Sequence, residues 1–446
     1  MIKLSRGFDI KLLGRAEKKV LQVETPSRYA IKPTDILGIG PIPKLNVEVG
    51  SRVKAGESLF FDKQRPRIQF CSPVSGEVVS INRGAKRAIT EVVVQADREV
   101  QYHPFEVPNL DAAAREDLVE LLLRSGAWVL IRQRPFNVLP DPDIIPRDIF
   151  ISCFDTAPLA PDQNVLMEGK EEDFQAGLSV LQKLTSGRVH LGVSAASSDV
   201  FTKAKGVNIT SFSGAHPAGN VGVHIHHVAP INKGETLWTI KPQDVAIIGR
   251  LFLKGIFDAK RTVVLTGSEV NQHGYFQTLV GACVEPAIKG HLSKDDVRVI
   301  SGNVLTGSRI NRDGFLGLFD DQITVIETGD RPEFFGWLFP SYPRPSLSRT
   351  FTSFLKPSKK YKVNTRTHGC ERAFVVTGEY EKVVPMDIYP QYLLKSILYN
   401  DFEQMEGLGI YEVVEEDIAL CEFVCTSKQP VQHILRSGLD LVRIEG

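Results

Sequence analysis

Residues 47–60 read Val47-Glu-Val-Gly-Ser-Arg-Val-Lys-Ala-Gly-Glu-Ser-Leu-Phe60, and residues 72–81 read Ser72-Pro-Val-Ser-Gly-Glu-Val-Val-Ser-Ile81. Apolar residues alternate with polar ones over short runs, and glycines lie between the runs. This pattern predicts short β-strands joined by tight turns. We therefore expect a small β-barrel or sandwich within residues 1–100.

The same spacing resembles the biotinyl/lipoyl hammerhead, a barrel-sandwich hybrid in which a hairpin tip carries an Asp-Lys pair and the lysine holds the cofactor. Asp62-Lys63 lies at the equivalent place. Pro66 follows and would reshape an exposed tip, because proline fixes its own φ angle. Two interpretations stay open: Lys63 carries a lipoyl or biotinyl group, or it is an ordinary solvated lysine.

Strands alternate with helices in the next segment, residues 101–257. Strands are predicted at 128–131, 149–154 and 189–193, and two apolar helix faces are formed by Leu118, Val119, Leu122 and Leu123 and by Phe174, Leu178 and Leu181. Such alternation implies a parallel sheet with right-handed crossovers. We expect a nucleotide-fold-like α/β domain here.

A nucleotide phosphate needs a glycine-rich turn whose backbone N–H groups approach the anion. No glycine occurs between Gly126 and Glu168, and Arg132 and Arg134 offer charge without such a cradle. The domain is therefore predicted to be degenerate, and we expect no flavin, dinucleotide or other cofactor to be bound by this chain.

The last two regions are predicted to be a β-grasp-like domain and a helical one. Residues 258–330 return to short β-runs at 262–266, 297–300 and 322–326 around a helical patch at 275–280. Residues 331–446 begin with a linker marked by Pro340, Pro343, Pro345 and Pro357, followed by helical periodicity at 392–399, 415–424 and 431–444. The chain is thus expected to combine α/β and β domains in one multi-domain protein.

Composition excludes several classes of function. The 446 residues include 53 basic and 53 acidic ones, without a long run of like charge, so nucleic acid is not an expected partner. No apolar window approaches the eighteen or so residues that span a bilayer, and the N-terminus has no secretory signal. Six dispersed cysteines are expected to be reduced, which fits a cytoplasmic protein.

Four of the ten histidines fall within residues 216–227, at His216, His224, His226 and His227. Residues 221–228 are predicted to form a strand, which would place His224 and His226 on one face and His227 on the other. A metal site would need a third ligand, for which only His216 is near in the sequence. The alternative is a histidine-bearing strand at a domain or subunit contact.

Cys421 and Cys425, with the distant Cys370, raise the question of an iron–sulfur cluster. Such clusters usually take four ligands, and a spacing of four on a helix equally suits two buried thiols. No nucleophile elbow and no paired-carboxylate arrangement is evident. We therefore predict neither a catalytic residue nor a metal ligand.

Over essentially its whole length the chain resembles the NqrA family of the sodium-translocating NADH:quinone oxidoreductase. The motifs that carry the resemblance are Ile2-Lys-x-x-x-Gly7-Phe-Asp9, Ser72-Pro-x-Ser75-Gly76, Asn82-Arg-Gly-x-Lys86-Arg87, Ser213-Gly-x-His216-Pro-Ala-Gly219, His224-Ile-His226, Thr236-Leu-Trp238-Thr-Ile240, Ile300-Ser-Gly302, Phe335-Gly-Trp337, Pro385-Met-Asp387-Ile and Glu416-Asp-x-Ala419-Leu-Cys421-x-x-Val-Cys425.

The resemblance implies a fold similar to the flavin-binding subunit of respiratory complex I, including a β-grasp domain of the SLBB type. It also implies a peripheral protein on the cytoplasmic face of a bacterial inner membrane, within a six-subunit complex. The partners would be the other five subunits, NqrB to NqrF, chiefly the membrane protein NqrB. The complex exports sodium while electrons pass from NADH to ubiquinone, through FAD, FMN, riboflavin and iron–sulfur centres in other subunits.

Three functions follow as hypotheses. The first is a cofactor-free subunit that supports quinone reduction and assembly, with His216, His224 and His226 as candidate quinone-proximal residues. The second is a stand-alone biotinyl/lipoyl-like carrier or binding module that uses Lys63. The third is an electron-transfer subunit of the Rnf type with iron–sulfur clusters.

Overall fold

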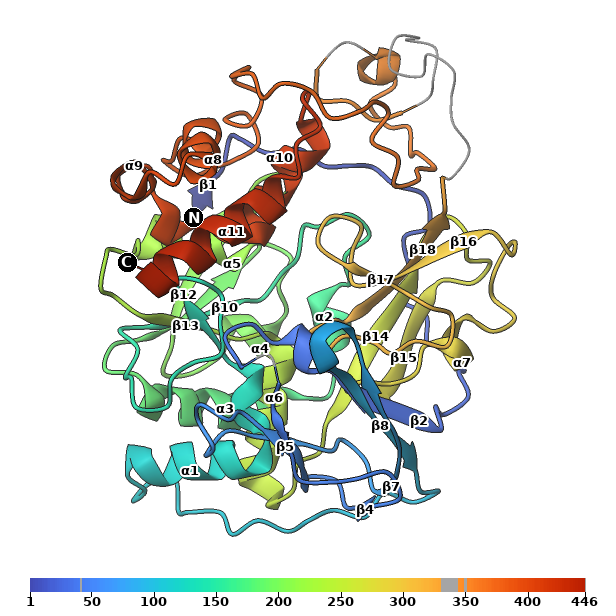
Figure 1. Cartoon of the computed structure of the whole chain (residues 1–446), viewed down its shortest axis with the longest axis vertical. Helices are drawn as coiled ribbons and strands as arrows, with labels where there is room; N and C mark the ends of the chain where they lie inside the picture. Colours follow the sequence, from blue (N-terminus) through green and yellow to red (C-terminus); the bar gives the residue numbers. More distant parts are fainter. Residues whose placement is uncertain (41, 330–343, 349–350, 446) are drawn as a thin grey trace.

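A computed structural model of the chain describes residues 1–40, 42–329, 344–348 and 351–445. Four parts follow one another along the chain: a β-barrel, an α/β layer, a second β-sheet and a cap of C-terminal helices (Figure 1). The predicted linker residues Pro340 and Pro343 and the motif Phe335-Gly-Trp337 lie outside the described residues. None of the helices in the described ranges combines the length and the apolar character that crossing a membrane requires.

The N-terminal barrel consists of a four-stranded and a three-stranded sheet, as the alternating pattern predicted. The first sheet has the order β2-β8-β7-β4, with β2 (Arg28–Ile31), β4 (Arg52–Val53), β7 (Gly76–Arg83) and β8 (Ile89–Ala96). The second has the order β3-β5-β6, with β3 (Lys44–Leu45), β5 (Ser58–Phe61) and β6 (Gln69–Cys71). Phe60 and Phe70 stack in the buried interior with ring centroids 4.7 Å apart.

The α/β part contains a six-stranded sheet of order β1-β12-β11-β10-β13-β9. Its strands are β1 (Ile2–Lys3), β9 (Arg132–Arg134), β10 (Ile149–Ser152), β11 (Val189–Val193), β12 (Asn208–Ser213) and β13 (Leu237–Thr239). Every pairing is parallel except that of β9 with β13. The predicted parallel sheet is therefore confirmed.

Helices cover both faces of this sheet. One face carries α1 (Arg115–Ser125), α3 (Glu171–Leu184) and α6 (Pro242–Lys254), and the other carries α5 (Val221–Val228) beneath the C-terminal helices (Figure 1). Two further helices are single turns, α2 (Gln163–Leu166) and α4 (Asp199–Thr202). Helices α3 and α6 cross closely because Gly177 and Gly249 face the backbone of Val245 and Asp173, which leaves no room for a Cβ atom.

The second β-sheet has the order β15-β14-β18-β16-β17, in which only β14 and β18 are parallel. Its elements are β14 (Lys260–Thr266), β15 (Gly274–Leu279), β16 (Val297–Ser301), β17 (Ser308–Ile310), β18 (Gln322–Glu327) and the short helix α7 (Glu285–Ile288). The C-terminal cap contains α8 (Pro390–Leu398), α9 (Phe402–Gly407), α10 (Glu415–Val424) and α11 (Val431–Glu445). Helices α8, α10 and α11 confirm the three helices that the apolar periodicity of the tail predicted.

The structure corrects three predictions of secondary structure. Residues 221–228 form helix α5 rather than a strand, so the alternation of histidine faces that a strand would give is wrong. Residues 275–280 belong to strand β15 rather than to a helix, in keeping with their aromatic and β-branched side chains. Residues 127–130 form a 3₁₀ turn, and the strand predicted there begins only at Arg132.

The first thirty residues cross the molecule before they enter the barrel. Strand β1 pairs with β12, Leu12 bridges to Tyr361, Val20 bridges to Tyr275, and Tyr29 bridges to Ala282. The N-terminal segment therefore contacts the α/β sheet, the tail and the second β-sheet in turn.

Candidate functional site

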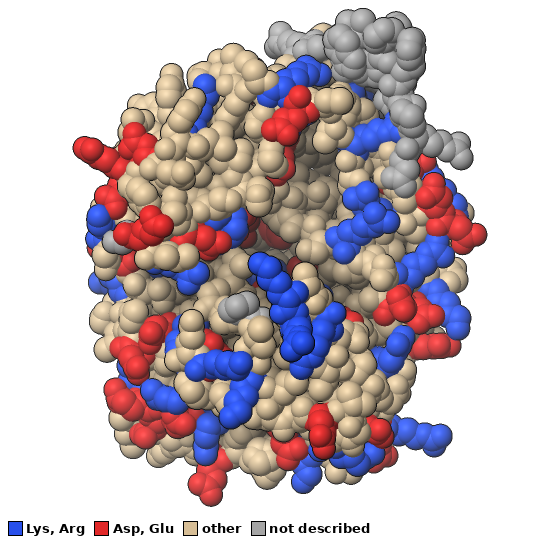
Figure 2. Space-filling model, viewed as in Figure 1, with Lys and Arg blue, Asp and Glu red and all other residues tan. Residues whose placement is uncertain are grey.

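A cleft of about 460 Å³ opens at the carboxyl ends of strands β10 and β13. The chain runs from β10 outward to β11 and β12 and then returns to the other side of β10 to form β13. In open α/β sheets this reversal of strand order creates a crevice at which ligands bind. Ser152 and Thr239, at the ends of the two strands, both line the cleft. Figure 2 shows this face of the molecule hollowed beside the C-terminal helices.

The walls of the cleft come from every part of the fold except the barrel. The α/β domain contributes Phe154 and Ile240, the second β-sheet contributes Phe319, and the start of α10 contributes Glu415 and Glu416. Arg132 lies over the ring of Phe319 at 3.7 Å from its centroid. The cleft is therefore assembled only when the three domains are packed together.

The electrostatic character of the cleft is acidic. Among the residues that the structure describes, six carboxylates line it, namely Asp155, Asp244, Asp320, Asp321, Glu415 and Glu416, whereas its basic residues are Arg132 and Lys241. In the floor, Arg261 donates hydrogen bonds to Asp244 and, at 3.1 Å, to Asp321. Burial raises the pKa of Asp244 to about 6, against the opposing effect of Arg261.

These residues do not fit a nucleotide phosphate. The loop that follows β10 has no glycine, and the Asp155 carboxylate caps it by accepting the N–H of Ala157 at 2.8 Å. A phosphate bound there would face carboxylates where nucleotide folds offer backbone N–H groups. The geometry agrees with the degenerate domain that the missing glycines predicted.

His216 is the predicted site residue that lines the cleft. Its backbone is fixed by the N-terminal segment: the N–H of His216 donates to Asp9 Oδ1 at 2.9 Å, and the N–H of Phe8 donates to the His216 carbonyl at 2.8 Å. Gly7 is required beside it, because a Cβ atom there would lie 2.5 Å from the His216 carbonyl oxygen. These contacts account for the motif at residues 7–9.

The ring of His216 is neutral near pH 7, because burial lowers its pKa to about 4. Nδ1 lies 3.2 Å from Thr156 Oγ1, and that hydroxyl already accepts the N–H of Gly219 at 2.9 Å. When the Thr156 hydroxyl donates a hydrogen bond to Nδ1, the neutral ring carries its own proton on Nε2. The imidazole is then a hydrogen-bond donor rather than a cation.

The other two predicted site residues lie away from the cleft. His224 is buried between Phe212 and Phe154, with ring centroids 4.1 and 5.4 Å away, and its Nε2 lies 2.8 Å from the carbonyl of Ala218. Gly192 is needed against this ring, since a Cβ atom there would lie 2.1 Å from His224 Nδ1. The structure thus separates His224 from His216.

His226 points toward the C-terminal cap. Its Nδ1 lies 2.6 Å from Glu412 Oε2, and its Nε2 accepts the N–H of Asp387 at 3.0 Å. The neighbouring His227 donates from Nε2 to the carbonyl of Pro385 at 2.8 Å. Both histidines therefore fix α5 to residues 385–387 and to the cap, which explains the motif found there. No cluster of three or more potential metal ligands occurs within the described ranges.

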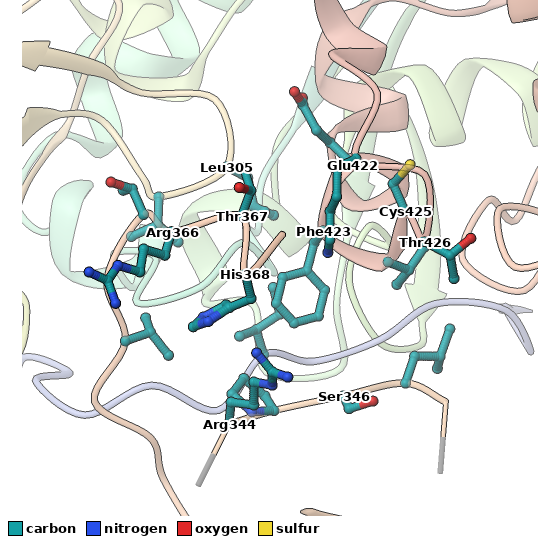
Figure 3. A pocket seen from close by; sticks show the side chains of 18 of the residues that line it. Leu305, Arg344, Ser346, Arg366, Thr367, His368, Glu422, Phe423, Cys425 and Thr426 are labelled. Carbon is teal, nitrogen blue, oxygen red and sulfur yellow. The ribbon is translucent and has the colours of Figure 1, made fainter. Parts of the chain in front are cut away.

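A second cavity, of about 740 Å³, lies beside the cleft, and Leu305 and Gln432 line both. Figure 3 shows Arg366 and His368 on one side of it and Phe423 and Cys425 on the other. Arg366 and His368 already take part in contacts within the chain. We regard the cleft as the candidate site because it lies at the ligand-binding edge of the sheet.

The tail cysteines lie in the core of the C-terminal cap. Cys421 and Cys425 are both buried, and burial holds the pKa of the Cys421 thiol well above its usual range. Cys425 Sγ accepts the hydroxyl of Tyr380 at 2.9 Å. Cys370 is exposed. These observations favour packed thiols over cluster ligands.

The hairpin tip that carries Lys63 is held against the rest of the protein. Asp62 is fully buried and accepts Arg65 Nε at 3.0 Å, and Arg65 also donates to the carbonyls of Gly38 and Leu139. Lys63 is exposed, but the tip is not free to swing as a cofactor arm must. The lysine fits the interpretation of an ordinary solvated residue.

The fold and the cleft define a class of protein, a multi-domain α/β protein whose nucleotide-type crevice lacks a phosphate cradle. Three family models match the chain: the NqrA N-terminal barrel-sandwich hybrid domain at residues 2–97, the NqrA second alpha/beta domain at residues 113–257 and the NQRA C-terminal domain at residues 262–312.

Curated relatives match over the whole length. The chain is 37% identical to the NqrA protein of the Na(+)-translocating NADH-quinone reductase from Neisseria meningitidis serogroup B and 38% identical to that from Hahella chejuensis, over 100% of both chains in each case. The chain belongs to the NqrA family of the Na(+)-translocating NADH-quinone reductase. Among solved structures, a crystal structure of the NAD+-reducing [NiFe]-hydrogenase in the air-oxidised state matches 77% of this chain and 67% of its own, with 11% identity and a TM-score of 0.37.

Proposed function

We propose that the chain acts as the peripheral NqrA component of a sodium-exporting NADH:quinone reductase at the cytoplasmic face of a bacterial inner membrane. It would dock on the other members of a six-subunit complex, chiefly the membrane protein NqrB, and hold no flavin or iron–sulfur centre of its own. The observation that carries the proposal is the identity of 37–38% over the full length of curated NqrA chains.

The cleft is the part of the chain that we propose to support the quinone-reduction step. A quinone is a flat apolar ring that needs an apolar cleft and a hydrogen-bond donor at a carbonyl. Phe154, Ile240 and Phe319 supply an apolar part of the otherwise acidic cleft, and His216 supplies a neutral hydrogen-bond donor. His224 and His226, the other candidates, would act through the position of α5 rather than by touching quinone.

Membership of the complex is tested by purifying the tagged chain from native membranes in mild detergent. We expect flavin-bearing membrane proteins and quinone reductase activity in the eluate. A chain that elutes alone from well-solubilised membranes would contradict the proposal. An intact mass that is higher than the sequence mass by a lipoyl or biotinyl group on Lys63 would support the carrier hypothesis instead.

The role of the cleft is tested by kinetics of the whole complex. Substituting His216→Ala should raise the apparent Michaelis constant for quinone several-fold while NADH oxidation with an artificial acceptor is unchanged. His433→Ala, at an exposed histidine of α11, is the matched control and should change neither value. Failure of the His216→Ala complex to assemble would show a structural role instead.

A further inference from the structure

The carboxylates of the cleft are not all neutralised. Within the described part of the chain, four of the six form ion pairs, whereas Asp155 and Asp320 form none. One of the paired cations is itself shared, because Arg134 contacts both Glu416 and Asp417. The cleft therefore favours a ligand that brings positive charge.

Two buried carboxylate oxygens in the cleft have no hydrogen-bond partner among the residues that the structure describes. Asp244 is 1% exposed, and its Oδ1 accepts from Arg261 while its Oδ2 has no partner. Glu415 Oε1 accepts Arg436 Nη1 at 3.2 Å, but its buried Oε2 has none. A buried charged acceptor is costly to leave unpaired. Both atoms are acceptors, so they favour a ligand that donates hydrogen bonds.

The two carboxylates without ion pairs come from different walls of the cleft. Asp155 lies in the loop after β10, and its Oδ1 accepts the N–H of Ala157 at 2.8 Å. Asp320 lies just before β18 in the second β-sheet, and its Oδ2 accepts the hydroxyl of Ser301 at 2.6 Å. The remaining oxygens, Asp155 Oδ2 and Asp320 Oδ1, take no part in these bonds. A ligand with two cationic ends can engage both walls.

Hydrocarbon surface accompanies these charges. Phe154, Ile240 and Phe319 line the same cleft, and the Arg132 guanidinium lies over the Phe319 ring at 3.7 Å from its centroid. The ring thus already holds one cation on its face, although a single guanidinium cannot offset two unpaired carboxylates. A metal ion fits poorly, because the described ranges hold no group of three or more potential metal ligands and the cleft measures about 460 Å³.

We propose that the cleft binds an aliphatic amine with two or more primary ammonium groups. The ammonium groups donate to Asp155, Asp320 and the Oδ2 of Asp244, and the methylene chain lies against Ile240 and Phe319. Each ammonium group offers three N–H donors, which suits carboxylate oxygens that lack partners. This inference does not rest on the proposed function, because binding is measured on the chain alone, without quinone.

The test is isothermal titration calorimetry of the purified full chain with putrescine, a diamine, at constant ionic strength. We expect butylamine, which has one ammonium group, to bind about ten-fold more weakly, and butanediol, which has none, not to bind. Raising the salt concentration should weaken putrescine binding, since the Debye length falls from roughly 10 Å at 0.1 M to about 3 Å at 1 M. Failure of this test would leave the kinetic test of His216 unaffected.

The variant D155N/D320N keeps the shape of both side chains, removes both unpaired charges and should bind putrescine at least about ten-fold more weakly. D244N places an N–H group where the ammonium group donates, and it should also weaken binding. The matched control is D199N/D295N, which removes two exposed carboxylates outside the cleft and should bind as the parent does.

Circular dichroism and melting temperature establish that each variant is folded. Three results would overturn the proposal: no heat of binding with putrescine, equal affinity of the two double variants, or butanediol binding as well as putrescine. Displacement of putrescine by magnesium chloride at the same ionic strength would also overturn it, by showing an unspecific attraction of cations.

Discussion

At the scale of single residues, buried histidines decide how this protein responds to acid. His224 is enclosed by two phenylalanine rings and His216 by the N-terminal segment, and burial lowers the pKa of each to about 4. The pKa of a histidine in the unfolded chain is near 6.5, so the unfolded chain binds more protons than the folded chain between pH 4 and pH 6.5. Stability is therefore full above pH 6.5 and falls as the pH drops toward 4.

Substituting His224→Phe should reduce this dependence on pH. The phenyl ring fits between Phe212 and Phe154 but cannot be protonated. The loss of unfolding free energy between pH 7 and pH 5 should be smaller by roughly 2 kcal/mol than in the parent. Urea unfolding at pH 7 and pH 5 measures the loss of unfolding free energy, and His433→Phe, at an exposed position, is the control. If His224→Phe loses as much unfolding free energy between the two pH values as the parent does, buried His224 is not a source of the acid sensitivity.

Arg134 is the second residue at which the structure predicts a large effect of substitution on stability. It is 2% exposed and donates to Asp417 at 3.2 Å and to Glu416 at 2.6 Å, which joins the α/β sheet to α10. Arg134→Met leaves the Asp417 carboxylate buried without its cation and should cost about 3–5 kcal/mol of unfolding free energy. Chemical denaturation measures this loss.

Two further variants make the result interpretable. Adding Asp417→Leu to Arg134→Met removes the buried charge as well and should restore much of the stability. Lys203→Met breaks an exposed pair with Asp199 and should have little effect. A double variant no more stable than Arg134→Met would argue against a buried, unpaired charge as the cause.

At the scale of elements, helix α5 shows where local pattern and packing disagree. Val221, Val223 and Ile225 alternate with smaller or polar residues, which favours a strand. The helix forms because its N-terminal end packs on α10, where Asn220 Nδ2 donates to the carbonyl of Glu416 at 2.8 Å, and because His226 and His227 bond to the cap. Those partners lie some 160–200 residues away, so no local signal could reveal them.

The contact between α5 and α10 can be tested at Gly222. A Cβ atom there would lie 2.3 Å from Asp417 Oδ2, so Gly222→Ala should force the two helices apart and lower the melting temperature. Gly407→Ala in α9 is the control, since nothing lies within 4 Å of its Cβ position. That variant should be stabilised by about 0.5–1 kcal/mol, as alanine restricts the unfolded chain more than glycine does. Similar melting temperatures for the two variants would contradict the predicted clash.

The site was less predictable than the fold. Periodicity and glycine spacing were enough for the barrel, the parallel sheet and the tail helices, because each of these buries a face within its own segment. The acidic lining of the cleft comes from four separate segments, at Asp155, Asp244, residues 320–321 and residues 415–416. His216 could be predicted because it lies in a cluster of histidines in the sequence. The structure turns His224 and His226 of that cluster away from the cleft.

At the scale of the whole molecule, the N-terminal segment joins parts that would otherwise meet only through side chains. Its backbone contacts the α/β sheet, the tail and the second β-sheet within residues 2–29. The division into domains at residues 1–100, 101–257, 258–330 and 331–446 stays a prediction, and the first of these regions extends well beyond the barrel.

Removing residues 1–13 should uncouple these parts. We expect calorimetry to resolve two thermal transitions in place of one, because β1 and the bridge between Leu12 and Tyr361 are lost. A chain that lacks only residues 445–446 is the control and should melt as the parent does. One unchanged transition in the shorter chain would show that side-chain packing alone couples the domains.

The crossing of the N-terminal segment also bears on synthesis. Strand β1 is synthesised before its partner β12, which follows about two hundred residues later, and Tyr361 follows later still. Residues 2–3 therefore remain unpaired until β12 has been translated, and Leu12 remains without its bridge until Tyr361 has been translated. Closure of the N-terminal segment is thus a late step of folding, and any partner that recognises the closed form can be recruited only after Tyr361 has been made.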